Sequence, residues 1–199
     1  MRVIYALWLR NIKIFVRDRV RLVISIIIPF FFIYVFSAVF KSEQVENPTA
    51  FMLAGVIIVT VFQTSLSVAT TTIDDMISGF MKEVLVSPAS RFQVATGQLL
   101  SAATIATVQG LLILIVGLFT GLSFNSWRTP IYVVGAMILV GIVFSGLGLF
   151  LASKVKSAQT FQLVQQAIVL PFTFLSGAYI PLSLLPSTLR FVSYLNPMT

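Results

Sequence analysis

Residues 131–152 read IYVVGAMILVGIVFSGLGLFLA, an apolar run without a single charged side chain. A helix needs about 20 apolar residues to cross the hydrocarbon core of a bilayer, so this run predicts a membrane-spanning helix. Four further runs have the same character and also lack charged residues. They are 22–40, 50–73, 97–119 and 161–180. The sequence therefore predicts an all-α transmembrane bundle with five spans.

The composition of the whole chain agrees with this prediction. Of its 199 residues, 58% are hydrophobic and 10% are charged, and the mean hydropathy is +1.02, far from the composition of soluble domains. Cysteine and histidine are absent, which excludes thiol chemistry, histidine acid–base catalysis and the commonest metal ligands. We therefore expect no catalytic residue, metal site or cofactor. An intramembrane enzyme would also need paired carboxylates or a Ser–Lys pair at membrane depth, and the predicted spans contain neither.

Lysine and arginine are unevenly distributed among the segments outside the predicted spans. If the N-terminus is inside, ten basic residues lie on the cytoplasmic side: Arg2, Arg10, Lys13, Arg17, Arg19, Arg21, Lys82, Arg91, Lys154 and Lys156. Only Lys41, Arg128 and Arg190 lie on the other side. Because basic residues concentrate in the cytoplasm, we expect a cytoplasmic N-terminus, an extracytoplasmic segment 181–199 and a multi-pass protein of a bacterial plasma membrane.

The first 21 residues are amphipathic if they form a helix. Their apolar side consists of Tyr5, Trp8, Ile12 and Phe15, and their basic side of Arg10, Lys13, Arg17 and Arg21. Such a helix can lie flat in a membrane interface, or the basic residues can act only as a topology signal. A cleaved signal peptide fits less well, because the apolar run that follows is long and has no small-residue cleavage pattern. A basic segment of this kind indicates a membrane surface rather than nucleic acid.

A polar stripe runs along the second predicted span. Its members are Thr60, Gln63, Thr64, Ser67 and Thr71. Residues with this spacing lie along one side of a helix, so the stripe is a candidate substrate pathway. Alternatively, the hydroxyls bond back to carbonyls of their own helix and pack against other helices. Both interpretations stay open.

Two further patterns concern the last predicted spans. Small residues recur at helical spacing in span 131–152, which predicts close packing of helices. They are Gly141, Ser145, Gly148 and Ala152. Four glutamines lie where span 161–180 begins, and they can bond across helices or contact a substrate. They are Gln159, Gln162, Gln165 and Gln166.

The segment 74–96 connects the second and third spans and alternates charged with apolar residues at helical spacing. We expect it to contain a short helix docked on the membrane or on a partner. The chain has no G-x-x-x-x-G-K-[ST] loop, so it cannot bind ATP in the manner of a P-loop ATPase. Its predicted spans also lack the charged residues that bind a driving ion. We therefore expect the energy for any transport to come from another polypeptide.

Two stretches carry a resemblance to a known family. Residues 83–91, EVLVSPASR, followed by Gly97, resemble the pattern E-x-L-x-x-[ST]-P-x-[ST]-R, with one residue instead of two between Leu85 and Ser87. Residues 176–181, SGAYIP, continue through LLP at 184–186 to NP at 196–197, which fits S-G-x-x-x-P-x-x-x-L-P…N-P. Together they resemble the membrane subunits of ABC-2 type transporters, especially drug-exporter permeases of the daunorubicin-resistance kind. The resemblance covers residues 1–199 as a single transmembrane domain.

The resemblance implies the permease subunit of an ATP-binding cassette exporter. Two such subunits, identical or different, would assemble with separate ATPase subunits and export an amphiphilic or drug-like substrate. It also implies that 1–21 is an interfacial helix and that 74–96 couples to the ATPase through Glu83, Pro88 and Arg91. The family has six spans, whereas this sequence stops at Thr199 after five, which implies a fragment or a natural truncation. The alternative function is a non-transporting membrane scaffold or accessory subunit.

Overall fold

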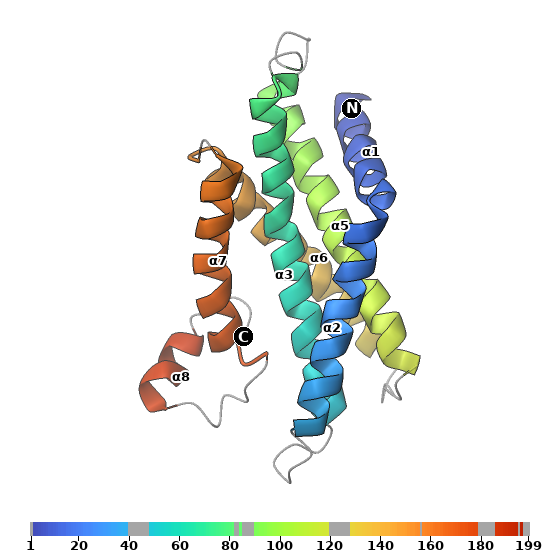
Figure 1. The fold of residues 1–199 in the computed structure, drawn as a ribbon, viewed down its shortest axis with the longest axis vertical. Coiled ribbons are helices and arrows are strands. Elements are labelled where there is room, and N and C mark those ends of the chain that lie inside the picture. Colours follow the sequence, from blue (N-terminus) through green and yellow to red (C-terminus); the bar gives the residue numbers. More distant parts are fainter. Residues whose placement is uncertain are drawn as a thin grey trace.

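The computed structural model describes residues 2–39, 48–81, 84, 90–119, 128–155, 157–178, 186–194 and 196. Within these ranges all regular secondary structure is helical, which confirms the all-α prediction. The helices are α1 (Arg2–Arg17), α2 (Arg19–Val39), α3 (Pro48–Ile77), α5 (Arg91–Phe119), α6 (Thr129–Ala152), α7 (Ala158–Leu175) and α8 (Ser187–Tyr194) (Figure 1).

Helix α3 lies at the centre of the bundle. It packs mainly against α5 and α6 and also contacts α2 and α7, while α1 packs along α5. In Figure 1, α1 and α2 follow one another along the bundle, α7 stands beside α3, and α8 lies at the end opposite the N-terminus. Helix α3 ends, and α5 and α7 begin, toward the end that holds the N-terminus.

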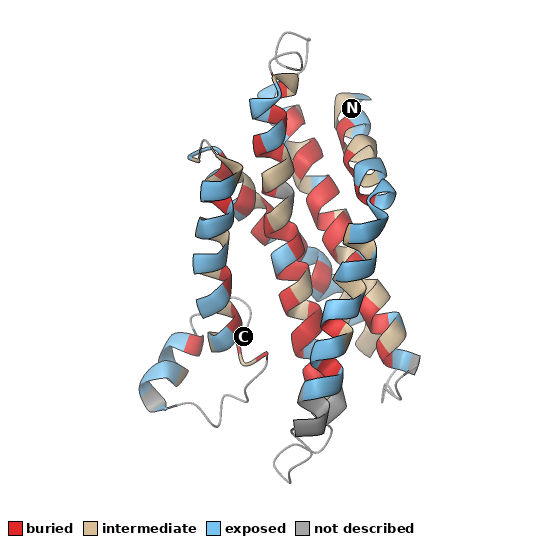
Figure 2. Ribbon diagram, in the orientation of Figure 1, coloured by how far each residue is buried: buried red, intermediate tan, exposed pale blue. Residues whose placement is uncertain are grey.

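Large apolar side chains of α3 form the middle of the core. Val61, Phe62 and Leu66 are fully buried, and the ring of Phe62 packs edge-on against Phe144 of α6, with 4.4 Å between centroids. Figure 2 shows buried residues along α3 and α5 and exposed ones on the outward faces of α2 and α7. The outer surface is apolar as well: Phe150 of α6, for example, is 63% exposed. Helices that are apolar on every side are typical of membrane spans.

Three of the described helices are long and apolar enough to cross a membrane: α3, α5 and α6. With 30 and 29 residues, α3 and α5 are each about 45 Å long, whereas the hydrocarbon core is about 30 Å thick. Both helices therefore extend beyond the core. Helices α2 and α7 overlap the other two predicted spans, 22–40 and 161–180. The four glutamines of α7 make it less apolar than α3, α5 and α6. The count of five spans stays a prediction.

The C-terminal part differs most from the sequence-based expectation. The predicted fifth span reaches residue 180, yet α7 ends at Leu175. Gly177 has a φ of +73°, a left-handed conformation that ends helices and that glycine adopts without strain. Within 181–199, where the sequence predicts only an extracytoplasmic segment, the eight-residue helix α8 forms.

Helix α1 packs through a face that overlaps the predicted apolar side only in part, at Phe15. Its buried residues are Leu7, Asn11 and Phe15, whereas Tyr5, on the expected apolar side, is 61% exposed. The packed face is thus rotated away from Tyr5. A polar residue occupies its centre because α5 supplies hydrogen-bond partners there. The interfacial position of α1 stays a prediction.

Candidate functional site

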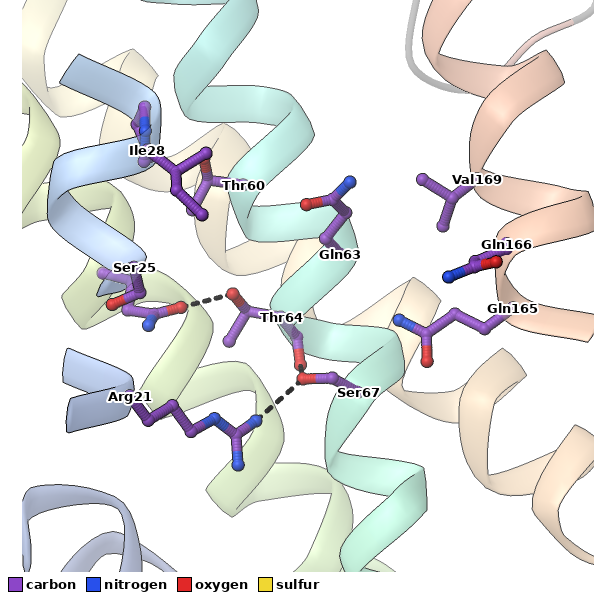
Figure 3. Close-up of a pocket in the computed structure, with 12 residues that line it drawn as sticks. Arg21, Ser25, Ile28, Thr60, Gln63, Thr64, Ser67, Gln165, Gln166 and Val169 are labelled. Atoms are coloured by element: carbon purple, nitrogen blue, oxygen red, sulfur yellow. Dashed lines mark hydrogen bonds between the residues drawn. The ribbon is translucent and has the colours of Figure 1, made fainter. Parts of the chain in front are cut away.

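A cavity of about 420 Å³ lies between α2, α3, α5 and α7. Its volume falls within the range of ligand pockets, about 300–1,000 Å³. In Figure 3, Gln165 and Gln166 extend from α7 toward α3, and Gln63 lies on the side of α3 that faces α7. Beyond α3, the lining consists of Arg21, Ser25, Ile28 and Pro29 from α2, Gln109 from α5, and Gln165, Gln166 and Val169 from α7.

The polar stripe of the second predicted span faces this space. Thr60, Gln63, Thr64 and Ser67 line the cavity, and Thr71 lines an adjoining one. The helical spacing of the five residues brings them to one side of α3, and α2 and α7 pack so as to leave that side open. A substrate-pathway role for the stripe stays a prediction.

The hydroxyls of the stripe are hydrogen-bonded within the protein. Thr60 Oγ1 donates to the Val56 carbonyl at 2.7 Å, and Ser67 Oγ donates to the Thr64 carbonyl at 2.9 Å. Thr64 Oγ1 donates to the Gln109 carboxamide oxygen of α5. The hydroxyls thus bond to groups of α3 and α5, as the packing interpretation expects. The same side chains also line a cavity, as a pathway would require.

Arg21 lines the cavity although the sequence pattern indicates another role for it. It precedes the first apolar run, so the sequence places it among the basic residues that act in a membrane interface or as a topology signal. In the structure its guanidinium extends from α2 to α3 and donates to Ser67 Oγ at 3.1 Å (Figure 3). Its Cζ also lies 5.9 Å from the centroid of the Phe15 ring. A long side chain can carry its charge this far from its own helix backbone.

A second cavity of about 330 Å³ adjoins the first. The two share Arg21, Ser67, Gln165 and Gln166. The second adds Thr70, Thr71, Asp74 and Gln162, so it extends toward the end of α3. Three of the four glutamines noted in the sequence therefore line this space, whereas Gln159 lies exposed outside it.

An ion pair joins α1 to the end of α3. Arg10 donates two hydrogen bonds to the Asp75 carboxylate, at 2.6 and 2.8 Å, and its guanidinium lies 4.1 Å from the centroid of the Phe80 ring. The hydrogen bonds to Asp75 and its negative charge raise the pKa of Arg10 above its ordinary value. Asp75 is buried, with 7% of its surface exposed. The sequence pattern does not predict this pair, since 65 residues separate its members.

Polar side chains also join α1 to α5. Asn11 Nδ2 donates to Gln98 Oε1 and to Ser101 Oγ, both at 2.8 Å. Trp8 Nε1 donates to Thr104 Oγ1 at 3.1 Å. These bonds explain why a polar residue lies at the centre of the packed face of α1.

The small residues of α6 lie where its backbone approaches its neighbours. All four, Gly141, Ser145, Gly148 and Ala152, are buried. A Cβ atom at Gly141 would lie 3.3 Å from Ala103 Cα of α5, and one at Gly148 would lie 3.3 Å from Leu66 Cα of α3. A larger side chain would therefore press on the backbone of α5 or α3.

The residues expected to contact an ATPase are only partly visible. Glu83 and Pro88 lie outside the described residues, while Arg91 is the exposed first residue of α5. From the second motif, Asn196 donates through Nδ2 to the Phe172 carbonyl of α7 at 2.8 Å, which satisfies a carbonyl in the last turn of that helix. Within the described ranges, no group of three or more acidic residues could hold a metal ion.

The chain is similar to several known proteins, among them the following three. The ycf38 protein of Cyanophora paradoxa, named as a putative transport permease, is 27% identical over 92% of this chain and 66% of its own length. Nodulation protein J of Rhizobium meliloti is 29% identical over 53% of this chain and 39% of its own length. YbhR of Escherichia coli K12, named as a probable multidrug ABC transporter permease, is 28% identical over 72% of this chain and 37% of its own length.

The chain thus spans 66% of the length of the first relative and less than half of the other two. No solved structure matches the chain significantly. A family model described as ABC-2 type transporter matches residues 2–199, which is nearly the whole sequence. This match agrees with the apolar helical bundle and with the names of the relatives. The chain therefore belongs to the ABC-2 type transporter family, whose members are membrane permeases.

Proposed function

We propose that this chain is the membrane-spanning permease subunit of an ATP-binding cassette exporter, which moves an amphiphilic or drug-like substrate out of the cell. The cavity between α2, α3 and α7 carries the proposal, because hydroxyl and carboxamide side chains face one another there inside an otherwise apolar bundle. Polar groups at membrane depth are typical of substrate routes. The name of YbhR supports placement in the drug-exporter group.

In this proposal α2, α3, α5, α6 and α7 are five spans of a single domain, and the N-terminus is cytoplasmic. Of the basic residues that predict this orientation, Arg10 pairs with Asp75, next to the Asp74 that lines the second cavity, and Lys154 lies shortly before the start of α7. The second cavity then leads from the cytoplasm toward Arg21, and the first continues from Arg21 into the membrane. Helix α1 lies at the cytoplasmic interface of a bacterial plasma membrane.

Family membership implies an ABC ATPase partner. The proposal assigns ATP hydrolysis to that separate subunit and includes a second permease subunit, identical or different. The ATPase would contact the segment 74–96 through Glu83, Pro88 and Arg91. The Arg10–Asp75 pair holds α1 against the start of this segment, where it continues from α3, so movement of the segment would be transmitted to α1.

The proposal is tested by purifying the protein together with an ABC ATPase encoded beside its gene. We expect the two to elute as one complex, with ATP hydrolysis that rises when an amphiphilic substrate is added. A permease that is folded but retains no ATPase, in the presence of a soluble and active ATPase, would contradict the exporter proposal and favour the scaffold alternative.

A charge reversal at Glu83 tests the assignment of the coupling segment. Glu83→Lys should weaken ATPase binding and uncouple hydrolysis from export, because like charges brought together in an interface cost about several kcal/mol. The control is Glu46→Lys, which makes the same change in the segment expected on the opposite side of the membrane. Equal ATPase binding by the two variants and the wild type would show that Glu83 does not face the ATPase.

A further inference from the structure

The cavity contains one charge, and that charge is positive. Arg21 is the single ionised side chain among its lining residues, all of which belong to the described ranges. Its guanidinium donates there to a neutral hydroxyl, Ser67 Oγ, at 3.1 Å. In the described part of the chain Arg21 forms no ion pair, in contrast to Arg10, which is paired with Asp75. Among the described residues, the guanidinium thus lies at the side of the cavity without a counter-ion in contact with it.

A cation in such a place favours an anionic ligand. A guanidinium offers five N–H donors in a planar fork that fits phosphate or carboxylate oxygens, and the bond to Ser67 uses one nitrogen. Hydrogen bonds between ionised groups are shorter and stronger than neutral ones. The attraction also increases where apolar helices exclude water from the site.

The other lining residues fit a headgroup joined to an apolar tail. Gln63, Gln165 and Gln166 can each donate and accept hydrogen bonds, and they lie on the two sides of the space between α3 and α7 (Figure 3). Further along the same cavity lie the apolar side chains of Ile28 and Val169. Charged, polar and apolar groups thus line the space together.

We infer that this cavity binds an amphiphile with an anionic phosphate or carboxylate headgroup, with Arg21 as the counter-ion and the three glutamines as partners for neighbouring polar groups. This inference rests on the proposed function, and it narrows the substrate class. Charge-free predicted spans favour an amphiphilic or apolar substrate. The positive charge of Arg21 in the cavity further indicates that this substrate carries a negative charge.

Binding by the purified protein in phosphatidylcholine nanodiscs tests the inference. The probes are oleoyl lysophosphatidic acid, mono-oleoylglycerol, which has the same tail without the phosphate, and inorganic phosphate. We expect the wild type to bind the lysophosphatidic acid about tenfold or more tightly than the neutral lipid, as a charge-assisted hydrogen bond implies. Inorganic phosphate should bind far more weakly, because it lacks the tail.

Variants assign the preference to the cavity. Arg21→Gln should abolish the preference for the anionic lipid over the neutral one, and Arg21→Lys should retain part of that preference. Arg19→Gln is the matched control, since it removes an equal charge from an exposed position in the same helix turn and should retain all of it. If Arg21→Gln fails to fold, Gln166→Leu at an exposed position should still weaken binding of both lipids severalfold.

Three results would overturn the inference: equal affinity for the two lipids, equal effects of Arg21→Gln and Arg19→Gln, or displacement of the lipid by inorganic phosphate at the same concentration. Binding is measured without an ATPase. A protein that binds the anionic lipid but no ATPase would therefore refute the exporter proposal alone, and a coupled exporter without the lipid preference would refute this inference alone.

Discussion

Replacing Arg10 by glutamine should release α1 from the bundle more effectively than replacing its partner. Removing one member of a buried ion pair costs about 3–5 kcal/mol, because the other charge is left buried without compensation. The side chain of Asp75 is 9% exposed, whereas that of Arg10 is 33% exposed. Arg10→Gln strands the buried carboxylate, and we expect a cost of about 3 kcal/mol, the low end of that range, since the pair is partly solvated.

Asp75→Asn should cost about 1 kcal/mol, because the partly exposed guanidinium regains water and the pair then resembles a surface one. The double variant leaves no stranded carboxylate, so it should cost less than Arg10→Gln alone. Only an asymmetrically buried pair predicts this order of effects. A pair exposed equally on both sides would give two similar single-variant costs.

Hydrogen exchange of the α1 amides in the purified protein measures these costs directly. Local opening of α1 should become about 100-fold more frequent in Arg10→Gln and about fivefold more frequent in Asp75→Asn, at about 1.4 kcal/mol for each factor of ten. Lys13→Gln, an exposed charge removal on the same helix, should leave exchange unchanged. Exchange in Asp75→Asn as fast as in Arg10→Gln, or costs that add in the double variant, would refute the reasoning.

Two further predictions compare matched positions by the thermal unfolding of purified protein. Gly148→Leu should lower the free energy of unfolding by about 1–3 kcal/mol, because its Cβ would press on the α3 backbone. Gly135→Leu should leave it unchanged, because an added Cβ atom there would meet nothing within 4 Å. Equal shifts in unfolding temperature would refute close packing as the reason. Thr64→Val should cost about 1–3 kcal/mol because it leaves the Gln109 oxygen without its donor, whereas Thr60→Val, whose hydroxyl bonds to its own helix, should cost less. A larger loss of stability in Thr60→Val than in Thr64→Val would contradict the assigned role of the Thr64–Gln109 hydrogen bond.

Much of the fold could be predicted because membrane spans are a local property. An apolar run of sufficient length forms a helix whatever its neighbours are, since no water is present to bond the backbone. The run 131–152 accordingly lies within α6, which begins two residues earlier, at Thr129. The end of α7 is not predicted because the apolar pattern continues past Gly177, while the backbone there turns left-handed.

The site could be predicted only where its residues belong to one helix. The stripe from Thr60 to Thr71 is visible in the sequence because helical spacing alone brings its members to one side. The bonds of Arg21 to Ser67 and of Arg10 to Asp75 join different helices. They depend on how those helices rotate and slide against one another, which a single sequence does not encode as a periodic pattern. For that reason the sequence assigns both arginines only to a membrane interface or to topology.

Transport by the reconstituted complex of this protein and its ATPase tests the exporter proposal most directly. Vesicles that contain the complex, with its ATP sites facing outward, are mixed with a fluorescent anionic amphiphile and ATP. We expect accumulation inside the vesicles that requires ATP hydrolysis and stops when the P-loop lysine of the ATPase is replaced. Accumulation that continues without hydrolysis, or its absence while the complex hydrolyses ATP, would contradict the proposed export of an anionic amphiphile.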